Sequence, residues 1–151
     1  MRKIEIREET LTGEVLSVLL TLSKDWEKEQ NVYGYRANER SDIEGNRIFL
    51  AYEGETVVGY CFGNGYASKN MRSIMPEGTW CFEVEELYVV PTFRSKGIGK
   101  RLMEAVCEAV RDEYEYITLA TATKNCKAIL HFYIDEVGMT FWSARLFKKL
   151  K

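Results

Sequence analysis

The spacing of hydrophobic positions changes within the first third of the chain. Ile4 and Ile6 alternate with charged residues, which predicts a short strand. Apolar residues then recur at three- and four-residue intervals, the pattern of an amphipathic helix: Leu11, Val15, Val18, Leu19, Leu22 and Trp26. Thr10 or Thr12 is expected to cap the start of this helix. The polar stretch from Gln30 to Asn46 is expected to be a loop or a broken helix.

The middle of the chain has the pattern of a hairpin followed by a long strand. Residues 48–52 and 56–62 flank Glu53-Gly54-Glu55, which predicts two antiparallel strands joined by a turn. Residues 80–90 are rich in β-branched and aromatic side chains, which predicts a further strand. Pro91 should end it, because proline cannot donate a hydrogen bond to the ladder.

Helix and strand patterns alternate in the last third. An apolar stripe from Ile98 to about Tyr114 predicts a second amphipathic helix, and residues 116–121 predict a strand. A third helix is expected over residues 125–136, ended by Gly138 in the left-handed conformation. The alternation in residues 139–150 predicts a final strand.

These elements predict one α/β domain over residues 1–151. The helix between the strands at 80–90 and 116–121 is a crossover, so these two strands should be parallel. The hairpin strands should be antiparallel. We therefore expect a mixed, mostly antiparallel central sheet with helices on both faces.

Composition and charge narrow the classes of function. Lys plus Arg number 21 and Asp plus Glu number 23, a near-balance that argues against a general nucleic-acid-binding or membrane-surface protein. No apolar run reaches the roughly 18 residues that span a bilayer, and no signal-peptide pattern is present, which predicts a cytoplasmic protein. The four cysteines lack zinc-site spacing, so we expect no metal site and interpret them as small buried hydrophobic residues.

The clearest chemistry lies between the long strand and the second helix. This stretch reads Leu87-Tyr88-Val89-Val90-Pro91-Thr92-Phe93-Arg94-Ser95-Lys96-Gly97-Ile98-Gly99-Lys100-Arg101-Leu102. The first N–H groups of a helix have no partner within it, and the helix dipole adds partial positive charge. Gly97 and Gly99 let an anion approach those groups, because they have no Cβ. Nearby basic side chains add positive charge, so we expect a phosphate or pyrophosphate site.

Two other glycine-rich phosphate motifs do not fit this loop. A P-loop requires Gly-Lys-Ser/Thr, and a dinucleotide-binding fingerprint requires a third glycine. In the simplest alternative, Gly97 and Gly99 serve only a tight turn. The spacing Pro-x-x-Arg-x-x-Gly-x-Gly, after a strand and before an amphipathic helix, favours the anion site instead.

The loop resembles the acetyl-CoA-binding motif of the GNAT N-acetyltransferase superfamily. The core of that motif, Arg/Gln-x-x-Gly-x-Gly/Ala, stands here as Arg94-Ser95-Lys96-Gly97-Ile98-Gly99. A later segment is similar to the family's second signature, with Asn125, Ala128, Phe132, Tyr133 and Gly138-Met139. The order of elements resembles the acyl-CoA N-acyltransferase fold over nearly the whole chain. In that fold the parallel strand pair splays apart.

The resemblance implies transfer of an acetyl group from acetyl-CoA to a primary amine by direct attack in a ternary complex. The acceptor would be a small-molecule or protein amine, and no metal is implied. The pyrophosphate is expected on the loop from Arg94 to Lys100, and the pantetheine arm along Leu87, Tyr88 and Val89. Asn125 belongs to the same expected donor site. A homodimer is compatible with the resemblance. The alternative is a non-catalytic acyl-CoA-binding sensor or regulatory module.

Catalysis of this reaction requires a base, an oxyanion donor and an acid. The resemblance implies Tyr133 as the acid for the departing thiolate, and the N–H of Val89 is the expected oxyanion donor. Glu83, Glu85 and Glu86 are candidate bases, and strict alternation places Glu83 and Glu85 on one face and Glu86 on the other. The resemblance favours Glu83, because its distance from Arg94 matches that of the catalytic glutamate in some relatives, while Glu85, Glu86 or a water chain stay open.

Two further expectations concern the second signature and the acceptor. Tyr133 follows Asn125 by one residue more than in many relatives, which predicts either a one-residue π-bulge or a different register for Asn125. His131 is expected to pack beside Phe132 or to face solvent. The resemblance implies that the acceptor enters beside the loops at 30–46 and 64–79. The candidates to line an amine-binding cleft there are Tyr33, Tyr35, Asp42, Glu44, Tyr66 and Trp80. In the simpler alternative, they are ordinary loop residues.

Overall fold

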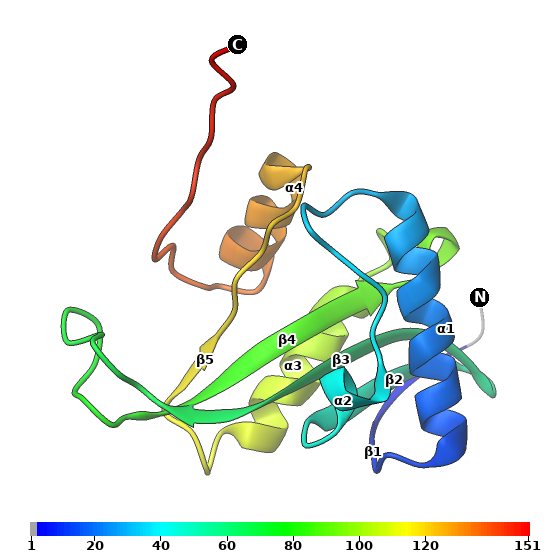
Figure 1. The fold of residues 1–151 in the computed structure, drawn as a ribbon. Helices are drawn as coiled ribbons and strands as arrows, with labels where there is room; N and C mark the ends of the chain where they lie inside the picture. Colours follow the sequence, from blue (N-terminus) through cyan, green and yellow to red (C-terminus); the bar gives the residue numbers. More distant parts are fainter. Residues whose placement is uncertain (1–2) are drawn as a thin grey trace.

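A five-stranded mixed sheet forms the centre of the computed structural model, which describes residues 3–151 (Figure 1). The strands lie in the order β1-β2-β3-β4-β5, and only β4 and β5 are parallel. Their bounds are β1 Ile4–Glu9, β2 Arg47–Glu53, β3 Thr56–Ala67, β4 Trp80–Val89 and β5 Tyr116–Thr118. The predicted mixed sheet, the β2–β3 hairpin and the parallel pair are confirmed.

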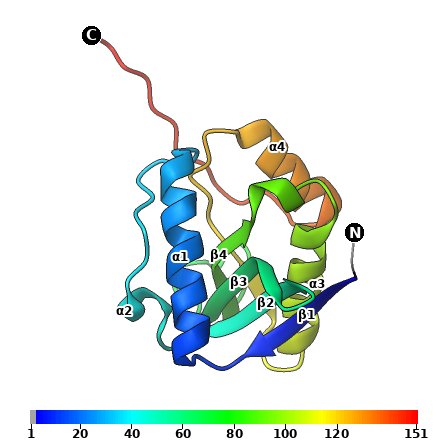
Figure 2. The ribbon, with the colours of Figure 1, turned by 90° about the vertical axis from the view of Figure 1, so that its right-hand side faces the viewer.

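Helices cover both faces of this sheet (Figure 2). On one face lie α1 (Gly13–Glu29) and the short α2 (Arg40–Ile43). On the other lie α3 (Ile98–Val110), α4 (Cys126–Leu130) and the π-helical η2 (His131–Glu136). A 3₁₀ turn, η1 (Pro91–Phe93), follows β4. None of the helices formed by residues 3–151 combines the length and apolar character needed to cross a membrane.

Each face of the sheet has its own hydrophobic core. Leu19 of α1 packs with Tyr60 and Tyr88 on the first face, and Leu102 and Val106 of α3 pack with Phe82 and other residues on the second. The stripes that identified these helices in the sequence therefore point to the sheet. The Thr12 hydroxyl accepts a hydrogen bond from the N–H of Val15 at 3.2 Å, which confirms it as the cap of α1.

A β-bulge at Glu85 changes which side chains share a face of β4. Phe62 pairs with Glu86 and the next residue, Gly63, pairs with Val84, so Glu85 has no partner on β3. The backbones approach so closely here that a Cβ on Gly63 would lie 2.0 Å from the carbonyl oxygen of Glu83. The bulge restarts the alternation, so Glu83 and Glu86 both face the α1 side. Strict alternation had separated them, and that prediction is wrong.

The parallel pair β4–β5 is short and opens into a fork. Pairing runs only from Cys81–Tyr116 to Glu83–Thr118, so β5 is shorter than the predicted strand at 116–121. Beyond Thr118, the chain that continues from β5 no longer pairs with β4. The N–H of Tyr33 donates to the carbonyl of Ala122 at 2.8 Å, and the N–H of Lys124 donates to the carbonyl of Asn31 at 2.8 Å. These bonds attach the connection after β5 to the loop after α1.

The predicted final strand at 139–150 is wrong. Residues 140–151 form no helix or strand, every one of them is exposed, and the segment extends away from the domain (Figures 1 and 2). We call these residues the C-terminal tail. No backbone hydrogen bond involves them within the described part of the chain. The alternating pattern predicted a strand. Such a pattern does not show whether the same chain contains a strand with which this segment can pair.

Candidate functional site

The loop between β4 and α3 presents a row of backbone N–H groups. Gly97 caps α3 with φ +80°, a left-handed conformation that glycine adopts without strain, and no side chain caps the helix. The N–H of Arg101 bonds to the carbonyl of Gly97 at 3.1 Å. Among residues 3–151, no hydrogen bond satisfies the preceding N–H groups, from Ser95 to Lys100. The side chains of Lys96, Lys100 and Arg101 are exposed beside them, so the loop has the geometry and charge of an anion site.

Arg94 has a different role from the neighbouring basic residues. Its Nε donates to the carbonyl of Val89 at 2.9 Å, and its two terminal nitrogens donate to the carboxylate of Glu29 at 2.7 and 2.9 Å. The Tyr88 hydroxyl also donates to Glu29, at 2.8 Å. Arg94 therefore joins the end of β4 to the end of α1, and its charge is already paired. Sequence reasoning missed Glu29, because nothing local links it to a residue 65 positions away.

The fork leaves backbone groups of β4 directed away from β3. The N–H of Val90 bonds to the carbonyl of Val58 at 2.9 Å, and bonding partners alternate along an antiparallel pair. Tyr88 therefore directs its backbone groups to β3, whereas Leu87 and Val89 direct theirs to the side where β5 has diverged. The structure thus brings the predicted residues Leu87 and Val89 to an open strand edge that leads to the glycine loop.

Glu83 lies at the apex of the fork, in the last residue pair before β4 and β5 separate. The Thr118 hydroxyl lies 3.1 and 3.3 Å from its two carboxylate oxygens, and the Tyr66 hydroxyl lies 2.9 Å from that of Thr118. Burial raises the pKa of Glu83, with a smaller contribution from the charge of Glu85, while the Thr118 hydrogen bond opposes the rise. A carboxylate with one hydroxyl partner and a raised pKa suits proton exchange.

Glu86 lies on the same face of β4 in a more elaborate network. Its Oε1 accepts hydrogen bonds from Tyr60 at 2.7 Å, Asn38 at 2.9 Å and Tyr35 at 3.1 Å. The Ser23 hydroxyl lies 2.6 Å from that of Tyr35. Burial raises the pKa of Glu86, and its three hydrogen-bond donors oppose the rise. The network holds the loop after α1 against the sheet, and its partners are too distant in sequence for local patterns to reveal.

Tyr133 lies in the π-helix η2, which agrees with the first of the two alternatives, a π-bulge in this helix. The N–H of Val137 bonds to the carbonyl of Phe132 at 2.9 Å, five residues earlier. Tyr133 packs against the core on the α3 face, and burial raises its pKa, so its hydroxyl stays protonated near neutral pH. Phe132 lies beside Gly99, where a Cβ would be 3.3 Å from its ring.

Asn125 and His131 lie at the surface of the same segment. Asn125 caps α4, and its N–H donates to the Thr123 hydroxyl at 3.0 Å. His131 faces solvent, as one of the two expectations had it, and its Nδ1 lies 2.8 Å from the Asp135 carboxylate. The cysteine interpretation holds for Cys61 and Cys81, which are buried, but is wrong for the exposed Cys126.

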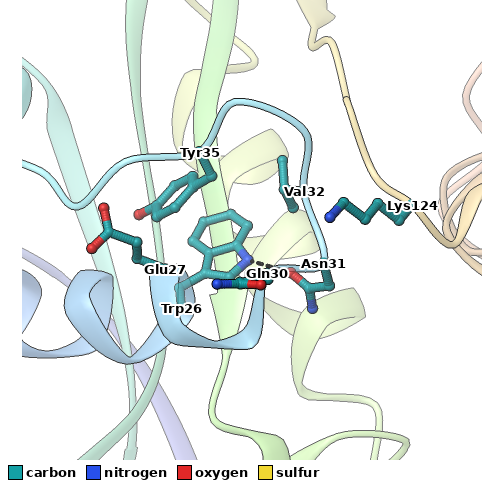
Figure 3. A pocket seen from close by; sticks show the side chains of 7 residues that line it. All are labelled: Trp26, Glu27, Gln30, Asn31, Val32, Tyr35 and Lys124. Carbon is teal, nitrogen blue, oxygen red and sulfur yellow. Dashed lines mark hydrogen bonds between the residues drawn. The ribbon is translucent and has the colours of Figure 1, made fainter.

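A cavity of about 200 Å³ lies between the end of α1, the loop that follows it and the connection after β5 (Figure 3). Its lining is Trp26, Glu27, Gln30, Asn31, Val32, Tyr35 and Lys124. The other predicted acceptor residues are scattered. Asp42 pairs with Arg36 at 3.0 Å, and Glu44 pairs with Arg40. Trp80 is exposed against Tyr114, and no group of three or more metal-ligating side chains occurs in residues 3–151.

Comparisons with known proteins agree with this geometry. Of the solved structures similar to this chain, one described as a transcriptional regulator from Bacillus halodurans C-125 has 20% identity and a TM-score of 0.71, covering 98% of this chain and 100% of its own. The aminoglycoside acetyltransferase AAC(6')-Iy, bound to a CoA bisubstrate analogue, has 15% identity and a TM-score of 0.69, covering 99% of each chain. Ribosomal-protein-alanine N-acetyltransferase from Brucella melitensis has 15% identity and a TM-score of 0.67, covering 97% and 99%.

These structural similarities show the fold, while the sequence itself shows the family. No curated protein matches the chain significantly. The model of the Acetyltransferase (GNAT) family matches residues 15–139, which include the glycine loop, both carboxylates and η2. The chain therefore belongs to the GNAT acetyltransferase family.

Proposed function

We propose that this protein is an N-acetyltransferase that moves the acetyl group of acetyl-CoA to a primary amine. The observation that carries the proposal is the fork between β4 and β5, which continues into the row of N–H groups from Ser95 to Lys100. A strand edge followed by an anion site matches a ligand with a peptide-like arm and a pyrophosphate. Acetyl-CoA has both.

The donor would lie along β4 from the fork to the glycine loop. The N–H groups from Ser95 to Lys100 would bind the pyrophosphate, and Lys96 and Lys100 would add charge. The pantetheine arm would pair with Leu87 and Val89 as an added strand. In this arrangement Tyr88 contributes through its position in the strand, because its side chain is bonded to Glu29. Arg94 would act by holding the loop in place, and Asn125 would contribute from the start of α4.

The reaction requires one bond to form and one to break. The neutral amine attacks the thioester carbonyl carbon, and the carbon–sulfur bond breaks. Glu83 would accept the proton from the ammonium group, directly or through water, and the N–H of Val89 would stabilise the oxyanion. Tyr133 would donate a proton to the departing thiolate. Its raised pKa keeps it protonated until that step.

The acceptor would enter from the α1 side, where the cavity beside Trp26 and Tyr35 approaches the face that carries Glu83 and Glu86. Aromatic rings and carboxylates favour a cationic amine there. Among the structural relatives, one acts on aminoglycosides and another on a ribosomal protein. We infer that the acceptor of this chain is likewise a small-molecule or protein amine.

Incubation of the purified protein with acetyl-CoA and a panel of amines tests this proposal. The panel contains aminoglycosides, polyamines, amino acids, and peptides with a free N-terminus or lysine. Release of the CoA thiol and a mass increase of one acetyl group on an amine are expected. Both signals should fall in Glu83→Gln, while Glu85→Gln, altered at the exposed neighbouring position, should keep them. Donor binding without acetylation of any amine would favour the sensor alternative.

A further inference from the structure

The cavity beside Trp26 and Tyr35 contains a primary amine of the chain itself. Lys124 lines this cavity, and Figure 3 shows its side chain pointing from the connection after β5 toward the loop after α1. The Lys124 amino group lies 5.3 Å from the centre of the Tyr33 ring. None of the ion pairs within residues 3–151 includes it. An amine that pairs with no carboxylate therefore lies in the space that the acceptor would occupy.

Backbone hydrogen bonds fix the position from which this side chain starts. The N–H of Lys124 donates to the carbonyl of Asn31 at 2.8 Å, and Thr123 forms a β-bridge with Val32. Both contacts attach the connection after β5 to the loop after α1. The amino group itself is carried on a flexible four-carbon stem. The backbone of Lys124 is thus held while its amino group can move within the cavity.

The register of the fork places Lys124 opposite the end of β4. Glu83 and Thr118 form the last residue pair, and Lys124 follows Thr118 by six residues, as Val89 follows Glu83. A pantetheine arm that filled the fork as an added strand would lie about 4.8 Å from each neighbouring backbone. The four-carbon stem of a lysine spans such a spacing. The amino group of Lys124 can therefore reach the arm.

Lys124 also approaches the fork from the side that carries Glu83. The Thr118 hydroxyl bonds to Glu83 on the α1 side of the sheet. In an extended segment every second side chain points to the same side, and Lys124 stands an even number of residues after Thr118. Its place in the lining of the α1-side cavity agrees with this alternation. The amine of Lys124 and the proposed proton acceptor therefore share one side of the fork.

We propose that the protein acetylates its own Lys124 when acetyl-CoA is bound and no other amine occupies the cavity. This inference rests on the proposed function. The Lys124 ammonium group loses a proton to Glu83, directly or through water, and the nitrogen attacks the thioester carbonyl carbon. The amide bond forms, the carbon–sulfur bond breaks, and CoA leaves as a thiol with a proton from Tyr133. The acetylated side chain is uncharged and longer, so it narrows the cavity for a later acceptor.

Peptide mass spectrometry after incubation with acetyl-CoA in an amine-free buffer measures this modification. Lys124 should gain an acetyl group at least about tenfold faster than Lys127, because a bound donor is held beside it. Lys127 is the internal reference, since it is exposed in α4 and lies outside the cavity lining. With saturating acetyl-CoA, the rate constant should not depend on protein concentration, because the transfer occurs within one molecule. Lys124→Arg keeps the charge and should abolish the accompanying release of the CoA thiol.

Two variants of the glycine loop separate enzymatic transfer from chemical acetylation. Gly97→Asp should lower the rate at Lys124 to that at Lys127, whereas Gly97→Asn should keep it, because only the aspartate repels the pyrophosphate. Equal rates at the two lysines, equal rates in the two variants, or a rate constant that rises with protein concentration would each overturn the proposal.

Thermal unfolding distinguishes failure of this inference from failure of the proposed function. If acetyl-CoA stabilises the protein and Lys124 stays unmodified, self-acetylation is wrong and the proposed function stands. If acetyl-CoA neither stabilises the protein nor modifies it, the donor site is wrong and both proposals fall. Stabilisation together with rapid modification of Lys124 is the expected result.

Discussion

The carboxylates of Glu83 and Glu86 lie on the same face of one strand but in different surroundings. At Glu83 the only hydrogen-bond partner among residues 3–151 is Thr118, and the strands begin to separate at that point. At Glu86 three side chains converge on one oxygen, two of them from the loop after α1. Burial raises both pKa values, so the pKa alone does not distinguish them. The hydrogen bonds do: they support the proposal that Glu83 is the proton acceptor, and they make Glu86 an anchor for the loop.

Removal of the Glu83 charge is expected to have the largest effect on activity. Glu83→Gln should lower kcat/KM by about 10²–10³-fold, because a base in proton transfer contributes on this scale. The rise of kcat/KM with pH, whose midpoint should lie above the ordinary carboxyl pKa of 4.5, should also disappear. A pH-rate profile measures both effects. Equal activity in Glu83→Gln and wild type would remove the distinction between the two carboxylates.

Tyr133, the proposed acid, lies across the sheet from both glutamates. Tyr133→Phe should lower kcat by about 10–10²-fold with little change in KM, because the hydroxyl would act on the leaving thiolate rather than in binding. Tyr116→Phe, at an exposed tyrosine of β5, serves as the matched control in steady-state kinetics. If Tyr133→Phe changed only KM, Tyr133 would be a binding residue instead.

Glu86 should influence stability more than Glu83 does. Glu86→Ala leaves the hydroxyls of Tyr60 and Tyr35 and the amide of Asn38 without their acceptor, which should cost about 2–3 kcal/mol. Glu85→Ala at the exposed bulge position should stay within about 0.5 kcal/mol. Urea unfolding measures both variants. Similar losses for the two would mean that the network at Glu86 does not hold the loop.

The smallest expected effect is on the pH dependence of stability. A carboxyl whose pKa is raised by folding binds its proton more tightly in the folded state, so its stabilising contribution is present below pH 4.5 and is lost as pH rises through the raised pKa. The free energy of unfolding should therefore fall over this window through the Glu83 contribution. Glu83→Gln should flatten that fall in urea titrations between pH 4 and 8. An unchanged slope would contradict burial as the cause of the shift.

Local sequence patterns predicted the parts of this molecule that depend on neighbours in the chain. The glycine loop, the Thr12 cap and the stop at Pro91 follow from nearby residues. Comparison with the family left a π-bulge before Tyr133 as one of two alternatives, and the structure has a π-helix there. The family resemblance added the function and the fork between the parallel strands.

Features that depend on distant contacts could not be predicted in this way. The bulge at Glu85 depends on the approach of β3 at Gly63, so simple alternation placed Glu86 on the wrong face. The pairing of Arg94 with Glu29 and the donors around Glu86 join residues separated by 26 to 65 positions. The tail has the pattern of a strand, but a pattern does not say which edge it would pair with.

Thermal unfolding with and without acetyl-CoA tests the central claim most directly. Wild type should gain about 2.7 kcal/mol at a hundredfold excess of ligand over Kd. Gly97→Asp should lose this gain, because a carboxylate beside the unpaired N–H groups repels the pyrophosphate. Gly97→Asn adds a side chain of the same size without charge at the same φ of +80°, which asparagine tolerates, and should keep most of it. No stabilisation of wild type at millimolar acetyl-CoA, or equal stabilisation of Gly97→Asp, would contradict a donor site on this loop.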